Sequence, residues 1–180
     1  MNLKEFPKIE LHLHLDGSVN LTLAQKLLNN SDEKIKKLMV AKDKCEDLNE
    51  YLTKFDTPIS IMQSKENIKL VSRELALSLI EDGVIYAEVR FAPIFHTKNL
   101  TLNEVVDSVI DGFKDLPIKI NLILCMMRNS SFEDNIKIIE LTKEKDAIEI
   151  WIETPPEGDT DSILTCLYLF PYDNGIVRIK

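Results

Sequence analysis

The chain has 180 residues, of which 44% are hydrophobic and 29% charged, an ordinary composition for one soluble globular domain. Its net charge of -8 argues against nucleic acid as a partner, because phosphate binding needs a basic surface, but does not exclude a neutral small molecule. No apolar run reaches the ~20 residues that a membrane helix needs, and the N-terminus lacks an apolar signal core, so we expect no membrane partner and a cytoplasmic location.

The first predicted element, Ile9 to Ser18, reads I-E-L-H-L-H-L-D-G-S and alternates strictly between apolar and polar residues. This alternation predicts a strand with one aliphatic face, which we expect to be packed against another element. His12, His14 and Asp16 then share the opposite face near the C-terminal end of the strand. Two imidazoles at this spacing can converge on one metal ion, although surface residues of an edge strand would show the same spacing.

The next predicted elements are a short helix over 21–29, a charged, lysine-rich helical stretch within 31–47 and a long helix over 64–82. Ser64 is expected to cap the long helix and Gly83 to end it. The buried stripe of this helix would consist of Ile68, Val71, Leu75 and Leu79. Residues 84–91 are rich in β-branched and aromatic side chains and predict a strand, on one face of which Glu88 and Arg90 would form a scaffold ion pair.

Four more elements follow in regular alternation. A Thr-x-x-Glu capping box at Thr101 opens a helix to about residue 114, and 118–127 is a strand. A second capping box, from Ser130 to Glu133, opens a helix to about residue 145, and 147–152 is a fourth strand. Strands joined through helices are parallel, so the sequence predicts an α/β fold that corresponds to the N-terminal half of a (β/α)8 barrel. A complete barrel takes ~250 residues, more than this chain has.

The first strand also carries a family resemblance. The segment Pro7 to Ser18, P-K-I-E-L-H-L-H-L-D-G-S, resembles the opening strand of the adenosine deaminase family of metal-dependent (β/α)8 hydrolases. The resemblance implies that His12 and His14 bind Zn²⁺, that His14 also lies beside the substrate, and that Asp16 contacts its ribose. It also implies that the third histidine ligand comes from a much later strand, so His96 is not expected to be a ligand.

A second segment, residues 47–58, resembles the family helix that shields the mouth of the active site. In the family, residues such as Leu48, Leu52 and Phe55 form an apolar lid over the purine, although ordinary core packing explains their helical spacing equally well. We interpret residues 1–150 as the half-barrel, with a lid-like helical insert at 31–63. Residues 151–180 diverge from the family, and the codons of Glu149 to Ile152 read two bases later can spell Asp-Leu-Asp, so we expect an out-of-frame or disrupted tail.

The implied activity is zinc-dependent hydrolytic deamination of adenosine or deoxyadenosine to inosine or deoxyinosine, with a small nucleoside as partner. The family's third histidine, its aspartate ligand and its proton-transferring glutamate belong to the later half, so no catalytic acid is expected within these 180 residues. One hypothesis is a deaminase homologue that is inactive alone, and the other is a non-catalytic barrel fragment. Adenine deaminase and N6-methyl-AMP deaminase are alternatives, although Lys54-Phe55-Asp56 favours adenosine. The oligomeric state is left open.

Overall fold

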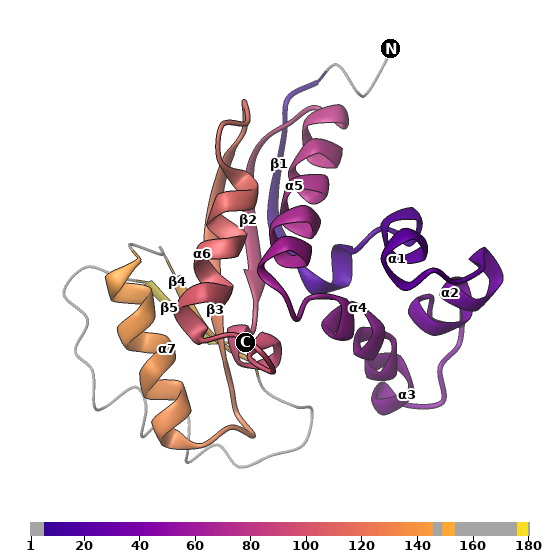
Figure 1. The fold of residues 1–180 in the computed structure, drawn as a ribbon. Helices are drawn as coiled ribbons and strands as arrows, with labels where there is room; N and C mark the ends of the chain where they lie inside the picture. Colours follow the sequence, from indigo (N-terminus) through magenta and orange to yellow (C-terminus); the bar gives the residue numbers. More distant parts are fainter. Residues whose placement is uncertain (1–5, 146–148, 154–175, 180) are drawn as a thin grey trace.

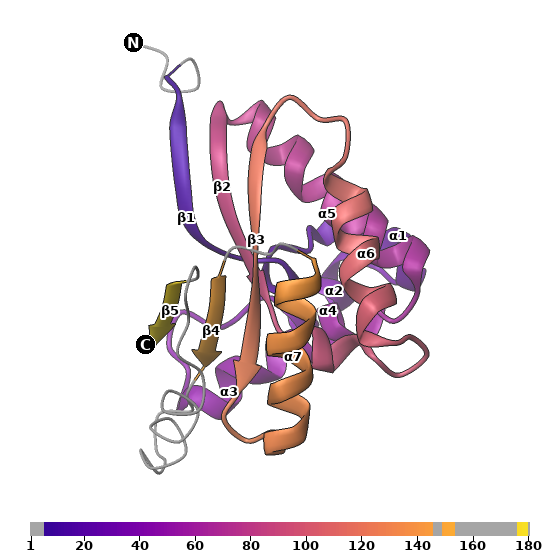
Figure 2. The same ribbon diagram turned by 90° about the vertical axis from the view of Figure 1, so that its left-hand side faces the viewer.

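The computed structural model describes residues 6–145, 149–153 and 176–179. Five strands form one sheet in which every neighbouring pair is parallel, in the order β1-β2-β3-β4-β5 (Figure 2). The strands are β1 (Lys8–His14), β2 (Val84–Phe91), β3 (Lys119–Met127), β4 (Glu149–Glu153) and β5 (Ile176–Ile179). The predicted parallel α/β order is confirmed, and β5 lies in the tail, beyond the four strands predicted for the half-barrel. The rest of the predicted divergent tail, 154–175, lies outside the described residues.

Three long helices lie on the same side of the strands (Figures 1 and 2). They are α5 (Lys65–Glu81), α6 (Leu102–Phe113) and α7 (Phe132–Glu144). The core between helices and sheet is formed by buried apolar side chains, among them Val71, Val89, Val106, Leu124 and Ile138. None of the helices among the described residues is both long and apolar enough to cross a membrane.

The end of each long helix follows from local chemistry. Ser64 Oγ accepts a hydrogen bond from the Asn67 N–H at the start of α5, and Gly83 adopts a positive φ of 80° just after its end. The predicted capping box at Thr101 is present in α6. The second box is wrong by one residue, because Ser131 rather than Ser130 caps α7 by accepting from the Asp134 N–H at 3.1 Å.

Helices α5 and α6 approach each other closely at Gly112. A Cβ atom at this position would lie 2.5 Å from the Ser72 Cβ and 2.6 Å from the Lys69 carbonyl oxygen. Real side chains do not tolerate such distances, so the absence of a side chain at Gly112 allows this helix pair to pack.

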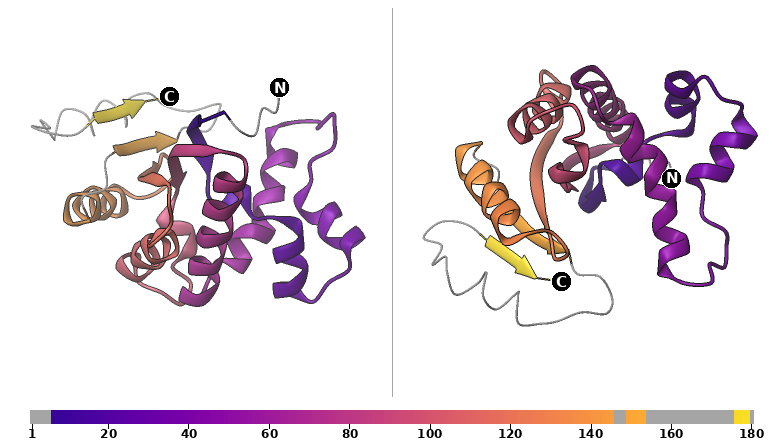
Figure 3. Two further views of the ribbon diagram at one scale, coloured as in Figure 1. Left: turned by 90° about the horizontal axis from the view of Figure 1, so that it is seen from above. Right: turned by 60° about the horizontal axis from the view of Figure 1, so that its bottom comes forward.

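The chain between β1 and α5 forms a group of short helices beside the C-terminal ends of the strands (Figures 1 and 3). They are α1 (Leu21–Leu28), α2 (Asp32–Met39), α3 (Leu48–Leu52) and α4 (Asp56–Ile61), with the 3-10 turns η2 (Asp16–Ser18) before α1 and η3 (Thr53–Phe55) before α4. The lysine-rich stretch is solvated as expected, but Ile35 is fully buried and anchors α2 to the core.

Strand β1 differs from its prediction. Ile9 is 63% exposed and Leu11 50%, so the expected packing of the whole aliphatic face is wrong for its first half, and only Leu15 is fully buried. Two features account for this: β1 lies at an edge of the described sheet, and its register against β2 shifts between Lys8 and Ile9 and between Glu10 and Leu13, which interrupts the strict alternation of its faces.

On the face of β2 opposite to Val89, which belongs to the core under the helices, Glu88 and Arg90 are buried. Glu88 accepts from the Tyr86 hydroxyl at 3.1 Å, and Arg90 Nη2 approaches the Leu11 carbonyl at 3.5 Å. Their mutual ion pair stays a prediction.

Candidate active site

The C-terminal end of β1 places the two histidines side by side. The ring centroids of His12 and His14 lie 5.5 Å apart with planes tilted by 39°, as expected for neighbours on one strand face. His14 is half-buried and His12 is exposed. The Leu15 N–H donates to the Arg90 carbonyl at 2.9 Å, which fixes the end of β1 against β2. The described residues contain no group of three or more His, Cys, Asp or Glu side chains that could hold a metal ion.

Asp16 follows in the tight turn η2 and is 6% exposed. Its Oδ1 accepts a hydrogen bond from the Gly17 N–H at 2.9 Å. The Ser18 hydroxyl donates to the His14 carbonyl at 2.5 Å, so the turn is bonded back to the strand. These bonds fix the turn that carries Asp16 at the end of the strand.

His14 and Asp16 open into a cleft of about 640 Å³. One wall consists of residues at or just after strand ends, among them Phe91, Ala92, Met127 and Asn129. The opposite wall comes from α3, η3 and α4 and contains Leu48, Tyr51, Leu52, Phe55, Asp56 and Ile59. A volume of 300–1,000 Å³ with apolar walls and few polar groups is typical of small-molecule sites.

Gly17 brings the two walls together. A Cβ atom at Gly17 would lie 3.2 Å from Cε1 of Phe55 and 3.4 Å from the His14 Cβ. The Phe55 ring therefore rests directly on the backbone of the turn that carries Asp16, and any side chain at Gly17 would push against it.

The predicted lid residues Leu48, Leu52 and Phe55 all line the cleft. Leu48 is 42% and Leu52 47% exposed, which is inconsistent with the alternative that they serve as core residues. Tyr51, Ile59 and Phe95 also line the cleft but were not predicted from the sequence. The rule that ligands bind at the C-terminal ends of parallel strands could have identified Phe95, which follows β2.

His96 belongs to η4 (Pro93–His96), the turn after β2. Its side chain is fully buried, and Nδ1 lies 3.2 Å from the Met62 carbonyl oxygen. Burial lowers the pKa of His96 to about 4, although the bond to Met62 raises it. Such a neutral, buried imidazole bonded to a backbone carbonyl is in an environment typical of a residue with a structural role.

Comparisons with known proteins identify the family of this chain. The family model described as adenosine deaminase matches residues 7–150. An adenosine deaminase from Enterococcus faecalis is 40% identical over 154 residues, which cover 79% of this chain and 46% of that protein. The chain thus spans about half the length of the curated relatives that it matches.

Among solved structures, an N6-mAMP deaminase from Arabidopsis superposes with a TM-score of 0.79 at 20% identity, over 98% of this chain and 59% of the other. An adenine deaminase from Arthrobacter aurescens gives 0.71 at 20% identity, over 89% and 53%. A zinc-bound amidohydrolase from Burkholderia ambifaria gives 0.76 at 15% identity, over 93% and 49%. These likenesses confirm the fold as an incomplete (β/α)8 barrel, and the family match shows that the chain belongs to the adenosine deaminase family.

Proposed function

We propose that this chain forms the N-terminal half of a deaminase site that hydrolyses adenosine or deoxyadenosine to the inosine product. The observation that carries the proposal is the cleft in which His14 and Asp16 face an apolar wall built from α3, η3 and α4. Asp16 would orient the ribose, and the wall containing Phe55 would cover the purine. The side chains that complete the reaction would come from the half of the barrel that the relatives have in addition.

The two histidines of β1 supply only part of a zinc site. His12 and His14 are adjacent imidazoles on one face and would supply two ligands. A catalytic zinc site has three protein ligands, and the described residues contain no group of three. When bound, the metal would supply a water with a pKa lowered to about 7. Because the pair alone does not complete such a site, we expect only weak zinc binding and no turnover by this chain alone.

The charge of the cleft favours a nucleoside over a nucleotide. Asp16 and Asp56 both line it, whereas none of its described lining residues is Lys or Arg. Lys54, the nearest cation in sequence, instead donates to the Lys37 carbonyl at 3.0 Å. A substrate phosphate would meet two carboxylates without a compensating cation, which favours adenosine over N6-methyl-AMP.

The test joins residues 1–150 to the C-terminal half of the Enterococcus faecalis relative and measures the conversion of adenosine in the presence of zinc. Turnover that is lost in His12→Ala but retained in Lys34→Ala, on the exposed face of α2, supports the proposal. A folded chimaera that fails to bind or deaminate adenosine, deoxyadenosine, adenine and N6-methyl-AMP would refute it.

The second candidate is a non-catalytic barrel fragment, which the incomplete ligand set favours. Residues 1–180 are assayed alone with adenosine and zinc. Turnover by residues 1–180 that disappears in His12→Ala would exclude this alternative. If residues 1–180 show no turnover but the chimaera is active, the chain carries half of a site.

A further inference from the structure

The C-terminal end of α4 is held by side chains from three directions. The last carbonyls of a helix lack partners within the helix. Here Ile59 O accepts from Gln63 Nε2 at 2.8 Å, and Ile61 O accepts from Asn67 Nδ2 at 2.9 Å. Met62 O, at the C-cap, contacts His96 Nδ1 at 3.2 Å. Asn67 ties α4 to the following helix, whereas Gln63 and His96 connect it to the turn after β2.

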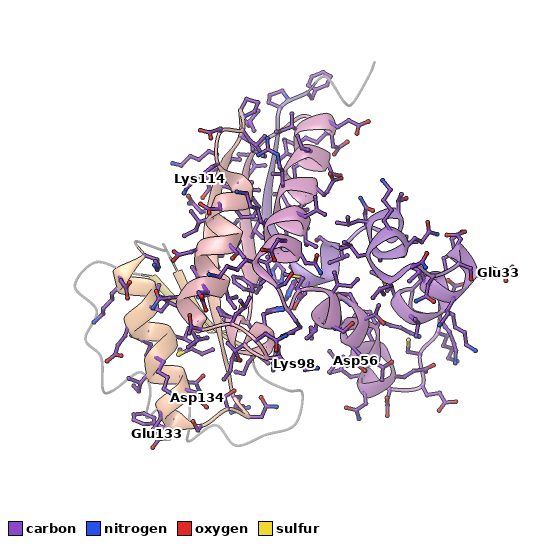
Figure 4. All side chains as sticks on the ribbon, in the orientation of Figure 1. Glu33, Asp56, Lys98, Lys114, Glu133 and Asp134 are labelled. Carbon is purple, nitrogen blue, oxygen red and sulfur yellow. The ribbon has the colours of Figure 1, made fainter. Side chains whose placement is uncertain are left out.

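Gln63 uses both ends of its amide in this connection. In addition to Ile59 O, its Nε2 donates to the Phe95 carbonyl at 2.9 Å, and its Oε1 accepts from the Lys98 N–H at 3.1 Å. One half-buried side chain therefore bonds to backbone groups on both sides of His96. Lys98 and Asp56, labelled in Figure 4, mark the loop and the helix that are joined.

His96 makes the buried part of the same connection. Because a carbonyl oxygen can only accept, Nδ1 carries the proton in the bond to Met62 O. The ring packs near Phe91 at a centroid distance of 5.7 Å, so its position is fixed from the strand side as well. The hydrogen bond and the packing together join the end of β2 to the end of α4.

The two joined segments contribute opposite walls of the cleft. Asp56 and Ile59 line it from α4, and Phe95 lines it from η4. We propose that His96 and Gln63 are positioning residues that clamp α4 to η4 and so hold the lid wall at a fixed distance from the strand ends. The clamp itself follows from the geometry alone, and only the use of the cleft for a purine nucleoside rests on the proposed function.

The test measures hydrogen–deuterium exchange of the 180-residue chain without ligand. It compares residues 48–62, the segment of α3, η3 and α4 that forms the lid wall of the cleft, with the core helix α5, 65–81. Gln63→Ala removes bonds at a half-buried position, and His96→Leu removes the buried one. We expect each to speed exchange in 48–62 by at least about tenfold, with little change in 65–81, because a lost hydrogen bond frees only the clamped segment. Lys98→Ala is the matched control, since the clamp uses the Lys98 backbone N–H and not its exposed side chain.

Rescue separates a positioning role from general packing. His96→Asn keeps an N–H donor at the position equivalent to Nδ1, because both nitrogens are bonded to Cγ, and is expected to restore slow exchange in 48–62, which His96→Leu does not. Equal acceleration in the lid and in 65–81, or unchanged lid exchange in Gln63→Ala, would overturn the proposal. Because no ligand is used, a confirmed clamp in a chain whose chimaera fails to deaminate would leave the inference standing and reject the proposed function.

Discussion

The stability of the folded chain should fall in mildly acidic solution because of one buried histidine. Burial lowers the pKa of His96 from an ordinary value of 6.5 to about 4, against the opposing effect of the Met62 carbonyl. The unfolded chain therefore takes up a proton at a higher pH than the folded chain does. His96 contributes full stability above pH 6.5, and this contribution is lost as the pH falls towards 4.

The size of the effect follows from proton linkage. Between pH 7.5 and pH 5, these two pKa values correspond to a loss of about 2 kcal/mol in the free energy of unfolding. Physically, an imidazolium at this position would carry a second N–H into a fully buried environment. Within the described residues, His96 Nε2 has no hydrogen-bond partner to receive it.

The assay is urea unfolding followed by far-ultraviolet circular dichroism at both pH values. His96→Asn cannot titrate and keeps a donor for Met62, so its pH dependence should be about 2 kcal/mol smaller than that of the unsubstituted chain. The comparison cancels the titration of all other groups that the two proteins share. If both proteins lose the same stability between pH 7.5 and pH 5, the imidazole is not held neutral by burial and the reasoning is wrong.

Two other substitutions test the packing and capping of α6. Gly112→Ala should destabilise the chain by about 1–3 kcal/mol in thermal unfolding, because a Cβ there would lie 2.5 Å from the Ser72 Cβ, and this overpacking outweighs the better helix propensity of alanine. A stability equal to or above that of the parent would show that the helices can separate without cost. The ion pair with Lys65, at 2.7 Å, and the bonds to Thr101 lower the pKa of Glu104 to about 2. Its contribution is present above pH 4.5 and lost as the pH falls through 2, so Glu104→Gln should show a shallower loss of stability below pH 4.5, and equal slopes would contradict this.

Much of the fold could be predicted because its signals are local. The β-branched run at 84–91 has the bounds of β2, and Ser64 with Gly83 marks α5 within one residue at each end. The burial of β1 could not be predicted in the same way. Alternation indicates that a strand has two faces, but whether Ile9 and Leu11 are covered depends on the position of the strand in the sheet.

Only part of the candidate site could be predicted from the sequence. His12 and His14 are neighbours because strand periodicity places them so. Asp16 was predicted on the same strand face, but β1 ends at His14 and Asp16 lies in the turn η2. The roles of Gly17 and Phe55 depend on a contact between segments nearly forty positions apart, which periodicity does not encode. His96 was not expected among the zinc ligands, which stays a prediction, and its bond to Met62 depends on tertiary packing and has no signature in the sequence.

The exposed edge strand β1 affects the tendency of the protein to associate with itself. It forms one edge of the described sheet and presents Ile9 and Leu11 to solvent. An open, apolar edge strand is a template on which another chain can add a strand. Self-association should therefore grow with protein concentration, and Leu11→Lys, which puts a charge on this edge without changing the residues of the cleft, should keep the chain dispersed for the measurements above.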